Sequence, residues 1–161
     1  MTPPIHDPEC QLCAQNTGAA PVPGGALYQD DLWLVRHAPA PYGVAGWLTV
    51  QTQRHVGEPA DFNDREAAAF GLAIRHFSRT LKAVTGALRI YLAAMGESVP
   101  HFHGHLVPRY EEMPGGASAW RVFDLSQRAA SGEITVDAAE VTRIAADFQA
   151  ALKASPHTGG W

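Results

Sequence analysis

The chain has 161 residues, of which 46% are hydrophobic and 17% charged, and its formal net charge is −4. These values are typical of one globular domain that is large enough to bury a core. The negative charge argues against a basic surface for long nucleic acids, and no apolar run approaches the roughly 20 residues of a membrane span. We therefore expect a single domain over residues 1–161, without a long nucleic acid or a membrane as partner.

The N-terminal segment ends in a pair of cysteines. Residues 1–9 lack the basic and apolar regions of a signal peptide, so a cytoplasmic location is the default expectation. The only two cysteines of the chain follow as Cys10-Gln11-Leu12-Cys13. In a reducing compartment this spacing indicates metal binding or redox chemistry. A redox pair would be expected at a strand-to-helix junction, whereas this pair is expected to precede a loop at residues 14–25. The pattern favours a metal site, which needs two further ligands.

Five short apolar runs are expected to form strands. They cover residues 26–28, 32–35, 47–51, 88–95 and 101–109. The first two are short enough to form a hairpin, and the loop at 36–46 contains two prolines and two glycines.

Three helices are expected among these strands. The longest begins after Asn63, which can form a capping box with Glu66, and it ends at Gly86. A short helix within residues 117–127 and a last helix over 136–154, capped by Thr135, complete the pattern. The order of these elements along the chain predicts an α+β fold, with an antiparallel sheet and helices packed on it. Three strands come first, followed by a helix, two strands and then the remaining helices.

The most informative stretch is His101-Phe102-His103-Gly104-His105, followed by Leu106-Val107-Pro108-Arg109. Its alternation predicts a strand that presents the three imidazoles on one face, about 6.6 Å apart. Three histidines in a plain core would each need a polar partner, so a phosphate or metal site is favoured. Arg109 more often packs at a strand end, and no catalytic role is assigned to it.

These residues resemble the signature of the histidine triad family, in which the middle histidine attacks a phosphate of a nucleotide. The resemblance implies that His103 is the nucleophile and that His105 when protonated donates to the phosphate or leaving group. It further makes Ser98 a candidate for binding the phosphate, with capping of the turn before the triad as the alternative role. It also implies a five-stranded sheet, a nucleotide or dinucleotide substrate and a homodimer. It covers residues 10–110, which leaves 111–161 as a C-terminal helical extension.

The N-terminal cysteines extend the resemblance to bacterial members of the family. Those proteins have a Cys-x-x-Cys pair, a histidine just after the third strand, and the first triad histidine as fourth zinc ligand. The matching positions here are Cys10, Cys13, His55 and His101. The resemblance therefore implies a structural zinc ion that leaves His103 free to react.

Two departures from the family pattern concern the nucleoside. The loop at 36–46 has no carboxylate to bind the ribose hydroxyls, and the loop at 93–98 has no asparagine. We therefore expect weak selection for the ribose. His105 stands where nucleotide-transferring relatives commonly have glutamine, which favours hydrolysis.

Three functions are weighed on this basis. The first is a nucleotidyl hydrolase, of phosphoramidase or dinucleoside polyphosphate hydrolase type, that acts through a covalent nucleotidyl-histidine intermediate. The second is a zinc-stabilised nucleotide-binding or scaffold module with little turnover. The third, a catalytic metal held by all three histidines, would require the two cysteines to play no part.

Overall fold

A computed structural model describes residues 6–156. Its centre is a five-stranded antiparallel sheet with the strand order β1-β2-β3-β5-β4. The strands are β1 (Tyr28–Gln29), β2 (Trp33–His37), β3 (Leu48–Thr52), β4 (Arg89–Ala93) and β5 (His103–Arg109). The α-helices are α1 (Gln11–Thr17), α2 (Asp64–Thr85), α3 (Leu125–Ala130) and α4 (Ala138–Ala154). The predicted α+β fold is confirmed, and no helix in residues 6–156 is long and apolar enough to cross a membrane.

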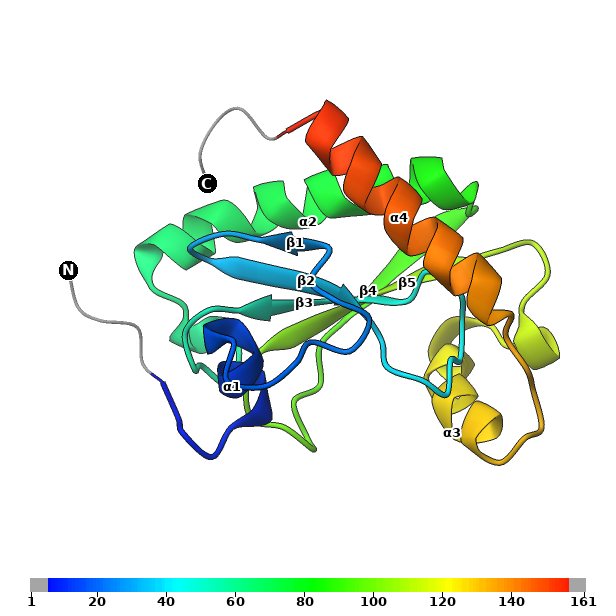
Figure 1. Cartoon of the computed structure of the whole chain (residues 1–161), viewed down its shortest axis with the longest axis horizontal. Helices are drawn as coiled ribbons and strands as arrows, with labels where there is room; N and C mark the ends of the chain where they lie inside the picture. The colour runs from blue at the N-terminus through cyan, green and yellow to red at the C-terminus, as the bar shows by residue number, and fades with distance from the viewer. Residues whose placement is uncertain (1–5, 157–161) are drawn as a thin grey trace.

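One face of the sheet is buried under the two long helices, α2 and α4 (Figure 1). Alternate residues of the central strands point into this core, among them Val35, Leu48 and Leu106, and meet Phe77 of α2 and Phe148 of α4. All five side chains are inaccessible to solvent. This layer makes the sheet a rigid support for the residues on its other face.

Helix α2 begins and ends as its sequence predicts. The Asn63 side chain accepts from the backbone N–H of Glu66, and the Glu66 carboxylate accepts from the backbone N–H of Asn63. Gly86 ends the helix in the left-handed conformation, with φ 66°, which glycine adopts without steric cost.

The other face of the sheet carries the polar residues. Helix α1 covers one end of this face, and α3 with the short helical turn before it (Ala119–Asp124) covers the other (Figure 1). The strand pairing sets Gln51 opposite His103, and Thr49 opposite both His105 and Arg36. Paired residues of neighbouring strands share a face, so these five side chains form two adjacent rows between α1 and α3. One row is Gln51 and His103, and the other is Arg36, Thr49 and His105.

Several predicted boundaries were wrong. The expected loop at 14–25 begins as helix α1, which contacts β3 through hydrogen bonds of Asn16 and shows too little periodicity to predict a helix. Strand β5 begins at His103, because His101 turns aside before it. The cap of α4 is Asp137, whose carboxylate accepts from the backbone N–H of Ala139, and not Thr135.

Candidate active site and metal centre

The two cysteines meet two histidines in a buried cluster. Sγ of Cys10 lies 3.4 Å from Nδ1 of His101, and Sγ of Cys13 lies 3.5 Å from Nδ1 of both His55 and His101. The four ligand atoms all lie within 4.8 Å of one another. Helix α1, the end of β3 and the start of β5 therefore converge on one point.

The geometry of this cluster fits zinc. Zn–S and Zn–N bonds of about 2.3 and 2.05 Å at the tetrahedral angle place sulfur and nitrogen about 3.6 Å apart. The observed separations of 3.4–3.5 Å agree with that value. Burial raises the pKa of the Cys13 thiol, so a thiolate here needs the positive charge of a metal. Two sulfurs and two nitrogens form the closed ligand set of a structural zinc site.

A backbone carbonyl orients His101, and an ion pair anchors the chain next to His55. Nε2 of His101 lies 2.8 Å from the carbonyl oxygen of Thr52, which can only accept, so Nε2 carries the hydrogen and Nδ1 offers its lone pair to the cluster. Next to His55, Arg54 donates from Nε and Nη2 to the buried Glu66 carboxylate at 2.8 and 2.6 Å. This ion pair holds the end of β3 against α2, a contact that no sequence pattern predicts.

His103 is the histidine that remains free to react. Its Nδ1 donates to the backbone carbonyl of His101 at 2.8 Å, which leaves Nε2 of the neutral ring unprotonated. Its ring lies 5.2 Å from that of His105. A histidine with one nitrogen fixed and the other free is what nucleophilic attack on phosphorus requires.

His105 is held in the opposite tautomer by an indole. Nε1 of Trp47 can only donate, and it lies 3.1 Å from Nδ1 of His105, so the hydrogen of the neutral His105 ring is on Nε2. Burial, with smaller effects from the charges of His103 and Arg36, lowers the pKa of His105 to about 4. The neutral ring can therefore donate from Nε2 at neutral pH, and the protonated ring that we expected from the sequence is not needed.

A pocket of 340 Å³ opens beside His103. Its wall includes Gly57 and Pro59 from one loop and Ala94 and Gly96 from the loop before the triad. Ser98 lies exposed on this second loop and does not line the pocket. The structure thus brings His103 and His105 together, and the phosphate-binding role of Ser98 stays a prediction.

The segment that follows the triad strand closes the other side of the site. Phe123 packs edge-on against His105 and Trp47, with ring centroids 6.0 and 5.7 Å apart. A largely apolar pocket of 260 Å³ lies beyond it, between Tyr91 and the exposed Trp120. The resemblance gave no role to residues 111–161, and no motif signals that these aromatics reach the triad.

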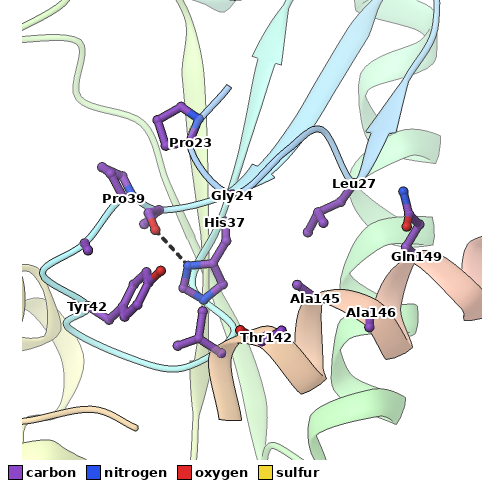
Figure 2. Close-up of a pocket in the computed structure, with 13 residues that line it drawn as sticks. Pro23, Gly24, Leu27, His37, Pro39, Tyr42, Thr142, Ala145, Ala146 and Gln149 are labelled. Atoms are coloured by element: carbon purple, nitrogen blue, oxygen red, sulfur yellow. Dashed lines mark hydrogen bonds between the residues drawn. The ribbon is translucent and has the colours of Figure 1, made fainter. Parts of the chain in front are cut away.

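The loop at 36–46, which has no carboxylate, borders a separate pocket of 260 Å³ next to α4 (Figure 2). Its His37 is buried, donates from Nδ1 to the Ala38 carbonyl at 2.8 Å and accepts at Nε2 from the Gly46 N–H at 2.9 Å. His37 pairs with Leu48, whose side chain is in the core beneath α2 and α4. This pocket therefore lies on the face opposite the triad, and none of the triad histidines lines it.

Comparison with solved structures identifies the fold. A scan of protein-family models and a search of curated proteins gave no match. A histidine triad nucleotide-binding protein from Sulfolobus tokodaii superposes with a TM-score of 0.67 at 15% identity, over 94% of this chain and 99% of that one. A zinc-bound histidine triad protein from Mycobacterium smegmatis gives 0.65 at 20% identity, over 91% and 94%. A histidine triad protein from Bradyrhizobium japonicum gives 0.60 at 25% identity, over 78% and 87%. The chain thus has the histidine triad fold that its sequence predicted.

Proposed function

We propose that this protein is a nucleotidyl hydrolase in which His103 carries the nucleotide during turnover. The observation that carries the proposal is the pair of opposite tautomers on adjacent histidines. Nδ1 of His103 donates to the His101 carbonyl, whereas Nδ1 of His105 accepts from Trp47. One ring therefore offers a lone pair and its neighbour offers a hydrogen, as attack on a phosphate and neutralisation of its charge require.

The reaction has two steps. Nε2 of His103 donates its lone pair to the α-phosphorus, and the bond to the leaving nitrogen or oxygen breaks with its electrons going to that atom. Nε2–H of His105 donates a hydrogen bond to a phosphate oxygen or to the departing atom. The departing atom takes up a proton from solvent. Water then attacks the same phosphorus, gives up a proton to solvent and displaces His103 with its electron pair, which releases the nucleoside monophosphate. The substrate is a phosphoramidate when the leaving atom is nitrogen, and a dinucleoside polyphosphate when the leaving atom is an oxygen of the neighbouring phosphate.

The metal has a structural part in this scheme. Cys10, Cys13, His55 and His101 would hold zinc, which would supply no reacting group and would fix the position of His101. The carbonyl of that residue is the acceptor that sets the His103 tautomer. The nucleotide-binding and zinc-bound proteins with which this chain shares its fold support both parts of the proposal.

His103→Ala tests the proposal against its alternative, a binding module with little turnover. The wild type should hydrolyse an adenosine 5′-phosphoramidate, and the variant should lose several orders of magnitude in rate with its melting temperature unchanged. His76→Ala, at a histidine of α2 outside the site, is the control. A variant that keeps more than about a tenth of wild-type turnover would refute the role of His103.

A further inference from the structure

Arg36 lies in the same row of side chains as His105. Arg36 pairs with Thr49 across β2 and β3, and Thr49 pairs with His105 across β3 and β5. Two strand spacings of about 4.8 Å set the Cα atoms of Arg36 and His105 about 10 Å apart. An extended arginine side chain spans most of that distance, so its guanidinium can approach a group bound next to His105.

The guanidinium of Arg36 is buried without a counterion. The residue is 7% exposed, and no carboxylate within residues 6–156 forms an ion pair with it. Its Nη1 donates to the His37 carbonyl at 3.2 Å, whereas its buried Nε has no hydrogen-bond partner. Burying a charge without an opposite charge is unfavourable, and the contacts of Arg36 within the described chain do not offset that cost.

A second buried group of the same row also lacks a partner. Thr49, between Arg36 and His105, is 3% exposed, and its hydroxyl forms no hydrogen bond within the described chain. Buried polar groups are nearly always paired, so unpaired ones side by side point to a ligand. An oxyanion satisfies both, because a guanidinium and a hydroxyl can each donate to it and arginine matches the planar fork of a carboxylate or phosphate.

We propose that Arg36, with Thr49, binds a second anionic group of the substrate, separate from the phosphate that His103 attacks. The inference rests on the proposed function and narrows its substrate class to nucleotides whose leaving group carries a phosphate or a carboxylate. The positive charge of Arg36 attracts this second anionic group, which then lies on the row of side chains formed by Arg36, Thr49 and His105. Neutral leaving groups leave the guanidinium unpaired and react more slowly.

The test compares pairs of substrates whose leaving groups differ in charge. Adenosine phosphoramidates of glycine and of glycinamide differ only in a carboxylate. A dinucleoside polyphosphate and the phenyl ester of the mononucleotide form the corresponding phosphate pair. Arg36→Met should lower kcat/KM at least tenfold for the anionic member of one pair and less than threefold for its neutral member. The pair that responds identifies the anion as carboxylate or phosphate.

Two further variants separate this role from a structural one. Arg36→Lys keeps the charge without the fork and should fall between wild type and Arg36→Met. Arg109→Met removes the same charge from the end of β5, where Arg109 donates to the Glu111 carbonyl, and should leave the ratio within each pair unchanged. The melting temperature of Arg36→Met should equal or exceed that of the wild type, because an unpaired buried charge is removed.

Equal losses on the charged and neutral members would overturn the inference, as would a lower melting temperature or a changed oligomeric state of Arg36→Met. If the wild type hydrolyses none of the four compounds, it is the proposed function that fails. Calorimetry with inorganic pyrophosphate then decides the inference by itself. Binding at least tenfold weaker in Arg36→Met than in wild type would support it, and equal binding would refute it.

Discussion

The backbone carbonyl of His101 accepts a hydrogen bond from Nδ1 of His103 at 2.8 Å, while the imidazole of His101 lies among the cysteines of the metal cluster. One residue thus links the metal cluster to His103, the proposed nucleophile. A metal that fixes His101 would also fix the tautomer of His103. Turnover should therefore depend on zinc content, although the proposed reaction uses no group bound to zinc.

We expect one zinc ion per chain when the protein is purified without added metal, as measured by elemental analysis. Cys13→Ser should lower the melting temperature by about 10 °C or more, because binding energy at a closed site is folding energy. The same variant should lose turnover in proportion to its zinc. His76→Ala, at a histidine outside the cluster, should change neither. If the purified wild type contained no metal and Cys13→Ser were equally stable, the proposed metal centre would be refuted.

The sequence predicted the sheet and helix α2 from local signals, and the four residues of the metal cluster from the family resemblance. Alternation defined the triad strand, and the Asn63 cap and Gly86 defined α2. The contacts that complete the site join distant segments instead. Trp47 reaches His105 across 58 residues, and Phe123 reaches it from a segment without family precedent. Arg36 could not be chosen from the sequence, because its burial depends on the register of three strands.

Trp47→Phe tests the hydrogen bond that fixes the tautomer of His105. Phenylalanine keeps an aromatic ring beside Phe123 and removes the N–H donor together with part of the buried indole ring. We expect kcat to fall about tenfold, equivalent to about 1.4 kcal/mol, with KM nearly unchanged. Phe123→Leu alters the packing while retaining the indole donor, and should affect kcat less. Unaltered kinetics in Trp47→Phe would show that the indole does not set the tautomer.

The stability of the protein should depend on pH through His105. Burial lowers its pKa from 6.5 to about 4, so between these values the unfolded chain binds a proton that the folded chain does not. The free energy of unfolding therefore falls as the pH falls through this window, by about 3 kcal/mol from His105. Urea titrations at pH 7, 6 and 5 should show a steeper loss for wild type than for His105→Gln. Parallel losses would contradict the buried, neutral state of His105.

We expect the protein to be a homodimer that pairs through β4. This strand is at the edge of the sheet, and Leu88, Leu92 and Met95 expose about half of their surfaces there. An apolar open edge invites pairing with another chain. Light scattering at micromolar concentration should show a dimer for wild type and a monomer for Leu92→Lys. Leu72→Lys, which places the same charge on α2, should remain dimeric. A monomeric wild type would refute this prediction.

The central claim is that the nucleotide is carried by Nε2 of His103, and trapping the intermediate tests it most directly. Enzyme mixed with an adenosine 5′-phosphoramidate would be quenched in alkali within the first turnover, because an N–P bond to imidazole is labile to acid. Mass spectrometry of the intact and digested chain would then locate any adduct. We predict one adenylyl group on the peptide that contains His103, formed at least as fast as steady-state turnover and absent from His103→Ala. Sustained turnover with no adduct, or with an adduct on another residue, would contradict the account.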